Sequence, residues 1–191
     1  MKNYLRISRG NLKGKKITFH AAYFVRPTQE KVRDSLFNIL GSQLKSSVFC
    51  DAFAGSGIMG FEAISLGAQS VIFIDKNLKV CRDIKFNQKN LEISRNEIQI
   101  LNSKLPQIWG LFFKKFSPDF IFMDPPYMDD SLGENCLRAI PSDQISEKTL
   151  IILEHHHKMP IKQSYSQIKK FREEKYGESR LSFFRKQRGK P

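Results

Sequence analysis

Short apolar runs that alternate with helical patterns restrict most strongly how this chain can fold. Between residues 48 and 154 the runs VFCDAF, SVIFID, EIQIL, DFIFMD and TLIILE appear in turn, and segments of helical periodicity separate most of them. Strands that are apolar throughout are typical of parallel sheets covered by helices on both faces. The pattern predicts a Rossmann-like α/β fold with a mostly parallel sheet, and two further strands near 166–172 and 180–186 predict a C-terminal antiparallel hairpin.

The N-terminal region follows a different pattern. Apolar and polar residues alternate on either side of Gly10-Asn11, so we expect a β-hairpin there. Thr28 is expected to cap a helix that runs to about Leu40. We therefore expect a hairpin and helix extension over residues 1–45 and a main domain over residues 46–191.

Positive charge is concentrated at the two ends of the chain. The net charge is +13; residues 1–46 and 158–191 each carry +8, and residues 47–157 carry −3. A basic surface that is segregated in this way indicates a polyanionic partner such as nucleic acid.

The cysteines, the N-terminal residues and the length of the apolar runs indicate where in the cell the protein is expected to be. Cys50, Cys81 and Cys136 lie far apart without CxxC spacing, which indicates reduced thiols rather than a disulfide framework. The first ten residues lack the apolar core of a secretory signal. No apolar run approaches the roughly 18 residues of a membrane span. We therefore expect a cytoplasmic protein with no membrane partner. We also expect a monomer, although the sequence does not determine the oligomeric state.

The histidine run at 155–157 is the one candidate metal site in the sequence. Adjacent side chains on an extended segment point alternately to opposite sides, so they converge poorly on one ion. We therefore expect the run to lie at a strand end or on the surface, and we expect no metal.

Residues 51–63, DAFAGSGIMGFEA, contain a glycine pattern between a predicted strand and a predicted helix. Gly55 to Gly60 match GxGxxG, and Asp75 follows at the end of the next strand. In nucleoside-binding folds such glycines let the backbone approach the ligand, and the acid on the second strand accepts hydrogen bonds from ribose hydroxyls. The arrangement predicts a nucleoside-binding crevice.

Asp51, which ends the first of these strands, distinguishes between nucleoside ligands. A dinucleotide would bring its pyrophosphate to the start of the following helix, where an acid would repel it. An acid suits instead the cationic amino-acid end of S-adenosylmethionine. The loop therefore favours S-adenosylmethionine over NAD, and a dinucleotide-dependent oxidoreductase is the alternative from a different class.

The second chemical motif is Asp124-Pro125-Pro126-Tyr127, which follows an apolar strand. The exocyclic amine of a nucleobase is a poor nucleophile because its lone pair is delocalised into the ring. Acceptors for the amine hydrogens, here the Asp124 carboxylate and the Pro125 carbonyl, would turn that lone pair toward a methyl donor. The prolines stiffen the loop, and Tyr127 is expected to stack on an extruded base.

Together these motifs resemble those of the amino-group methyltransferases, and the chain is most similar to the bacterial RsmD-type branch. The resemblance covers nearly the whole chain. It is carried by Arg9-Gly10, Gly14, Arg26-Pro27-Thr28, Val32-Arg33, Leu36-Phe37-Asn38, Asp51, Phe53-Ala54-Gly55-Ser56-Gly57, Gly60, Glu62, Asp75, Asn77, Asp124 to Tyr127 and Tyr176-Gly177. It implies a class I S-adenosylmethionine-dependent methyltransferase that modifies the N2 amine of a guanine in 16S ribosomal RNA, at nucleotide 966.

The resemblance and the motifs together define three sets of expected site residues. The catalytic set is Asp124, Pro125, Pro126 and Tyr127. The cofactor set is Asp51, Phe53, Ala54, Gly55, Ser56, Gly57, Asp75, Lys76, Asn102 and Ser103, where Asn102 and Ser103 stand in place of the acid that many methyltransferases have after the third strand. The RNA-binding set is Arg6, Arg9, Lys13, Lys15, Lys16, Arg26, Thr28 and Arg33.

The expected partner is 16S ribosomal RNA or the small ribosomal subunit. The C-terminal cations Arg185, Lys186, Arg188 and Lys190 either join the RNA contacts or form a mobile tail. The motifs also leave open an amino-methyltransferase that acts on DNA adenine or on a protein glutamine, and a non-catalytic RNA-binding protein.

Overall fold

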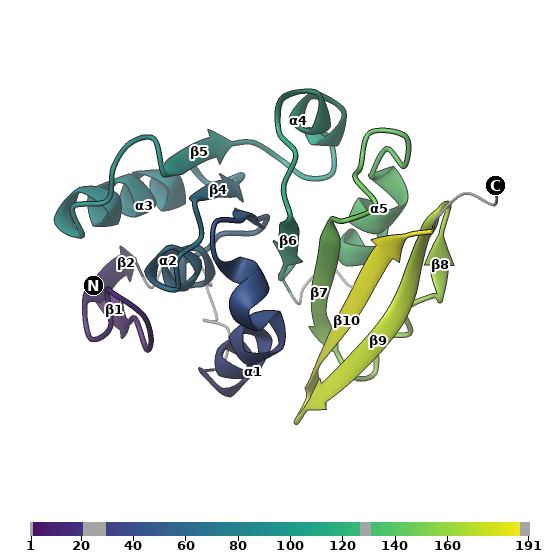
Figure 1. The fold of residues 1–191 in the computed structure, drawn as a ribbon, viewed down its shortest axis with the longest axis horizontal. Coiled ribbons are helices and arrows are strands. Elements are labelled where there is room, and N and C mark those ends of the chain that lie inside the picture. The colour runs from purple at the N-terminus through teal and green to yellow at the C-terminus, as the bar shows by residue number, and fades with distance from the viewer. Residues whose placement is uncertain (1, 21–29, 127–130, 188–191) are drawn as a thin grey trace. The chain divides into compact units, whose positions relative to one another are not determined.

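The computed structural model describes residues 2–20, 30–126 and 131–187 of the chain (Figure 1). The chain forms two compact units, of which the first ends at Ser103 and the second begins at Lys104. The N-terminal hairpin belongs to the same unit as the glycine loop. Among the described residues, no helix is both long enough and apolar enough to cross a membrane.

Three parallel strands form the centre of unit 1. Strand β4 (Ser70–Asp75) lies between β3 (Val48–Asp51) and β5 (Ile98–Asn102) and pairs with both in parallel. Helix α2 (Ile58–Ser65) connects β3 to β4, and α3 (Leu78–Asn90) connects β4 to β5. The strand and helix alternation that the sequence predicts is confirmed here.

A glycine lets α2 approach β4 closely. A Cβ atom at Gly60 would lie 2.2 Å from the ring of Phe73 and 2.7 Å from Val71 Cγ1. The rings of Phe61 and Phe73 pack with their centroids 5.2 Å apart. Because nothing larger than glycine fits at position 60, α2 and the loop before it are held tightly against the sheet.

The predicted N-terminal hairpin consists of β1 (Lys2–Arg6) and β2 (Lys16–His20), which pair antiparallel. It lies beside α2 and α3 (Figure 1). The side chain of Asn87 in α3 acts as an additional strand partner: its Oδ1 accepts from Thr18 N at 2.9 Å, and its Nδ2 donates to Thr18 O at 2.8 Å. The hairpin is therefore fixed to α3 by backbone-like hydrogen bonds.

A buried ion pair joins the end of the hairpin to two helices. Helix α1 (Glu30–Leu40) and the short η2 (Gly41–Leu44) precede β3. Glu62 of α2 is fully buried, and its Oε1 lies 3.1 Å from Arg33 Nε of α1. The same Oε1 accepts hydrogen bonds from the Ser8 amide at 2.6 Å and from Ser8 Oγ at 2.8 Å. One carboxylate thus ties three elements together.

Unit 2 contains a mixed sheet in the strand order β6-β7-β10-β9-β8. Strand β6 (Phe120–Met123) pairs in parallel with β7 (Leu150–His156). Strands β10 (Ser179–Lys186), β9 (Ile168–Tyr176) and β8 (Ser164–Tyr165) continue the sheet in antiparallel pairs. The predicted C-terminal hairpin is confirmed, and β8 adds a short third strand to it.

Two helices complete unit 2. They are α4 (Trp109–Lys115), in a segment whose apolar spacing is typical of a helix, and α5 (Leu132–Ala139). The indole Nε1 of Trp109 donates to the carbonyl of Cys136 in α5 at 3.2 Å, so the two helices are linked through a buried side chain. Helix α5 escaped the sequence analysis because a helix of eight residues offers only two turns of periodicity.

Candidate functional site

The loop between β3 and α2 turns sharply at two glycines. Gly55 and Gly57 have φ values of +51° and +79°, in the left-handed region that favours glycine. A Cβ at Gly57 would lie 3.0 Å from the ring of Phe61 and 3.2 Å from Ile84. Of the other predicted loop residues, Ala54 and Ser56 are buried and Phe53 is half-buried. The turn thus lies where the sequence predicts it, at the carboxyl end of β3.

Asp51 at the end of β3 is a buried carboxyl group with 2% of its surface exposed. Its Oδ2 accepts a hydrogen bond from the amide of Gly60 at 3.1 Å. Burial, together with a smaller effect of the negative charge of Asp75, raises the pKa of Asp51 to about 8, against the lowering effect of the Gly60 hydrogen bond. Within the described residues, no lysine, arginine or histidine forms an ion pair with Asp51.

Asp75 at the end of β4 is fixed by backbone donors. Its Oδ2 accepts from the amide of Gly55 at 3.1 Å, and its Oδ1 accepts from the amide of Asn77 at 2.8 Å. Burial raises the pKa of this carboxyl group, and the two amide hydrogen bonds oppose the rise. Each oxygen keeps acceptor capacity beyond these bonds, so Asp75 is oriented to accept further hydrogen bonds from a ligand.

These two acids fit S-adenosylmethionine as a ligand. Asp51 is a buried acid without a cationic partner in the described part of the chain, and a cationic ligand group would supply one. Asp75 is held by the loop itself and presents acceptors for hydroxyl groups. These two carboxyl groups of unit 1 therefore suit a cationic amino-acid group at Asp51 and ribose hydroxyls at Asp75.

Asn102 and Ser103 of the expected cofactor set lie around the end of β5. Asn102 Nδ2 donates to the backbone carbonyl of Asp75 at 3.0 Å, and the Ser103 amide donates to the same carbonyl at 3.0 Å. Lys76 is exposed. Asn102 and Ser103 thus lie next to Asp75, and one hydrogen-bonding group of each is already used by the backbone of β4.

In unit 2, the Asp124–Pro126 segment directly follows β6. Asp124 is half-buried, Pro125 is buried and Pro126 is exposed. Tyr127 lies outside the described residues. The four residues of β6 are all buried, so the motif begins where a core strand reaches the surface.

Gly133 of α5 supports this segment and was not singled out from the sequence. A Cβ there would lie 2.9 Å from Leu153 Cδ1 and 3.3 Å from Pro125 Cγ. Helix α5 can therefore pack closely against Pro125 only because position 133 has no side chain. A glycine inside a helix is the signal that could have indicated this contact.

The hairpin cations expected to bind RNA are mostly on the surface. Arg6, Lys13, Lys15 and Lys16 are exposed. Arg9 is half-buried and forms an ion pair with Asp34 at 3.4 Å, so its charge is partly compensated within the protein. Arg26 and Thr28 lie outside the described residues.

Arg33 corrects one expectation. It was expected to contact RNA, but only 4% of its surface is exposed and its guanidinium group is paired with the buried Glu62. A phosphate cannot reach the group without breaking that pair. Arg33 has a structural role, because a buried carboxylate requires a cationic partner.

His155 and His156 end strand β7 of the unit 2 sheet, and His157 follows it. His155 is buried, and its Nε2 lies 2.9 Å from Ser182 Oγ on the neighbouring strand. Burial lowers the pKa of His155, so it is neutral near pH 7. Within the described residues, no group of three or more histidine, cysteine, aspartate or glutamate side chains is arranged to hold a metal ion.

Comparisons with known proteins extend this description. A family model described as conserved hypothetical protein 95 matches residues 5–185. The chain is 34% identical to ribosomal RNA small subunit methyltransferase D of Buchnera aphidicola from Acyrthosiphon pisum, over 80% of this chain and 78% of that protein.

Solved structures share the fold. The yhhF protein of Escherichia coli has a TM-score of 0.79 at 24% identity, with 97% of this chain and 99% of that chain covered. An RNA methyltransferase of Salinibacter ruber, solved in complex with S-adenosyl-L-homocysteine, has a TM-score of 0.60 at 13% identity, with 86% and 96% covered. With its fold, its glycine loop and a family match over almost its whole length, the chain belongs to the conserved hypothetical protein 95 family of RsmD-type methyltransferases.

Proposed function

We propose that this protein transfers a methyl group from S-adenosylmethionine to the exocyclic N2 amine of a guanine in small-subunit ribosomal RNA. The observation that carries the proposal is the presence of two motifs, each following a buried strand of its own unit. One is the glycine loop with Asp51 and Asp75 in unit 1, and the other is Asp124-Pro125-Pro126 in unit 2.

The unit 1 residues have distinct roles in this proposal. Asp51 pairs with the cationic amino-acid end of the cofactor, which ionises the carboxyl group and returns its pKa toward the ordinary range. Asp75 accepts hydrogen bonds from the ribose hydroxyls, and Lys76, Asn102 and Ser103 flank the adenine. When bound, S-adenosylmethionine supplies an electrophilic methyl group on a sulfonium sulfur.

The unit 2 residues prepare the nucleophile. The Asp124 carboxylate and the Pro125 carbonyl accept hydrogen bonds from the guanine amine, so the nitrogen lone pair is directed away from the ring. As the nitrogen–carbon bond forms, the carbon–sulfur bond breaks, and the amine loses one proton to solvent. Pro126 stiffens the turn and Tyr127 stacks on the base.

The proposed substrate rests on similarity and charge. The named relative in Buchnera aphidicola is a ribosomal RNA small subunit methyltransferase. The exposed cations Arg6, Lys13, Lys15 and Lys16 on the hairpin supply positive charge for phosphate contacts. Because the hairpin is bound to α2 and α3, these contacts would be placed rigidly relative to the cofactor loop.

Labelled methyl transfer tests the proposal. The protein is incubated with methyl-labelled S-adenosylmethionine and small ribosomal subunits from a strain that lacks its gene, and nucleosides from the digested RNA are identified by mass spectrometry. The proposal predicts labelled N2-methylguanosine. Labelled N6-methyladenosine, or label in protein alone, would favour one of the alternative amine substrates and contradict the proposal.

A further inference from the structure

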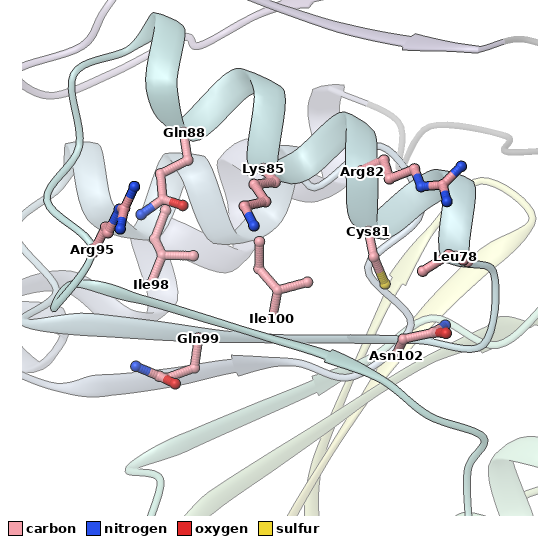
Figure 2. Close-up of a pocket in the computed structure, with 10 residues that line it drawn as sticks. All are labelled: Leu78, Cys81, Arg82, Lys85, Gln88, Arg95, Ile98, Gln99, Ile100 and Asn102. Atoms are coloured by element: carbon pink, nitrogen blue, oxygen red, sulfur yellow. The ribbon is translucent and has the colours of Figure 1, made fainter.

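A groove on unit 1 lies between α3 and the edge strand β5, outside the glycine loop, and one end of it reaches Asn102 of the expected cofactor set. It has a volume of about 520 Å³, within the roughly 300–1,000 Å³ that is usual for ligand sites. In Figure 2, Lys85 and Gln88 point from α3 toward β5, and Ile98 and Ile100 point from β5 toward α3. The groove therefore has an apolar floor beneath a polar wall.

The charge of the groove has one sign. Arg82, Lys85 and Arg95 line it and are exposed, and its ten lining residues include no carboxylate. None of these three cations forms a salt bridge within the described part of the chain. Asp83, the one acid on α3, faces the hairpin instead, where its Oδ2 lies 2.7 Å from His20 Nδ1.

Helix α3 therefore carries two different surfaces. Asp83 and Asn87 bind the hairpin, while Arg82 and Lys85 face the groove. The helix also carries Lys79 and Lys89, both exposed. A side chain at every third or fourth position lies on one side of a helix, so these cations form a basic stripe along α3.

We propose that this groove binds a nucleotide of the RNA substrate other than the target guanine. The phosphate is held by Arg82, Lys85 and Arg95, and the base lies against the half-buried Ile100. Single-stranded nucleic acid is bound in positively charged grooves that follow its phosphate backbone, and Arg82, Lys85 and Arg95 give this groove that charge. The inference rests on the proposed RNA substrate, to which it adds a second docking surface on the opposite side of α3 from the hairpin.

Charge-matched variants of the full chain test this site. Arg82→Gln with Lys85→Gln and Arg95→Gln removes three charges at the groove, and Lys114→Gln with Lys115→Gln and Lys148→Gln removes three exposed charges from unit 2. The probe is a fluorescein-labelled single-stranded RNA, with anisotropy measured at several salt concentrations. The groove variant should bind roughly ten- to a hundred-fold more weakly, and its salt slope should be smaller by about 0.7, as expected for one lost phosphate contact on a single strand.

Location is checked with RNA that contains 4-thiouridine, crosslinked by light and mapped by mass spectrometry. We expect crosslinks in α3 or β5, and S-adenosylmethionine affinity close to that of the wild type in both variants. Equal RNA affinity and salt slope in the two variants, or crosslinks confined to other elements, would overturn the inference. The proposed function fails by a different result, namely wild-type protein that yields no N2-methylguanosine.

Discussion

Asp51 is the residue at which the needs of folding and of ligand binding conflict most clearly. A free carboxyl group has a pKa of 3.8, whereas burial raises that of Asp51 to about 8. Below pH 3.8 the group is protonated in both the folded and the unfolded chain. Between the two values only the unfolded chain is ionised, so the folded protein loses stability as the pH rises. A cationic ligand bound beside Asp51 would favour the ionised carboxylate in the folded protein and so oppose this loss of stability.

Asp51→Asn should therefore have opposite effects on stability and binding. The amide still accepts the Gly60 hydrogen bond but does not ionise, so the free variant should be more stable than the wild type by on the order of 1–3 kcal/mol at pH 8. Its affinity for S-adenosylmethionine should fall. Denaturant unfolding at pH 4 and pH 8 checks the first effect, and a stability difference that does not grow with pH would contradict it.

Asp75→Ala should weaken cofactor binding without this gain in stability. Loss of a charged hydrogen-bond partner costs roughly 1.5–3 kcal/mol, or about ten- to a hundred-fold in affinity. Calorimetric titration with S-adenosylmethionine measures the change. Unchanged affinity would show that the ribose does not bind at the Gly55–Asp75 contact.

Helix α5 packs against the Asp124–Pro126 segment through Gly133, which approaches Pro125. Gly133→Ala should force Leu153 or Pro125 to move, because the new Cβ would lie 2.9 Å from Leu153 Cδ1. We expect a loss of about 1–3 kcal/mol in stability and a lower turnover number, with cofactor affinity unchanged.

Gly110→Ala is the matched control. Gly110 is also a helical glycine, in α4, but nothing lies within 4 Å of its added Cβ. This variant should gain about 0.5–1 kcal/mol from helix propensity and keep wild-type turnover. If both variants behave alike in unfolding and in turnover assays, the packing of α5 on Pro125 is not important for the reaction.

The hairpin is the element expected to carry RNA contacts. Lys13→Gln with Lys15→Gln and Lys16→Gln should lower RNA affinity and reduce the salt slope, since these exposed side chains are free to release counterions at phosphates. The unit 2 triple variant Lys114→Gln with Lys115→Gln and Lys148→Gln serves again as the charge control. Filter binding measures how RNA affinity falls with salt for each protein. If the hairpin variant has the same salt slope as the unit 2 control variant, the hairpin charges serve solubility alone.

Much of this arrangement could be predicted from the sequence because it depends on local patterns. Apolar runs and glycines located β3, β4, β6 and the cofactor loop, and the Asp51 and Asp75 positions followed from strand ends. The buried state of Arg33 could not be predicted, because its partner Glu62 lies on another helix, 29 residues away along the chain. Such a pair joins residues that are far apart in the sequence, so the local pattern around Arg33 does not indicate it.

For the whole molecule, the net charges of the three segments do not describe where the charged side chains lie on the surface. Residues 47–157 carry a net charge of −3, yet α3 within them presents a basic stripe toward the groove. The acids of this segment include the buried Asp51, Glu62 and Glu154, which contribute little to the surface. The net charge of this segment therefore does not reveal the basic surface on α3, because that surface forms only when the chain folds.

The central claim is that the Asp124 motif activates an amine for methyl transfer from a cofactor held by unit 1. It is tested most directly by single-turnover methyl transfer to small-subunit RNA with Asp124→Ala and wild-type protein, with S-adenosylmethionine affinity measured for both. We expect a rate about 10²-fold lower or more in Asp124→Ala, as for other preorganised hydrogen-bond partners, with cofactor affinity much less affected. Wild-type rates in Asp124→Ala would contradict it.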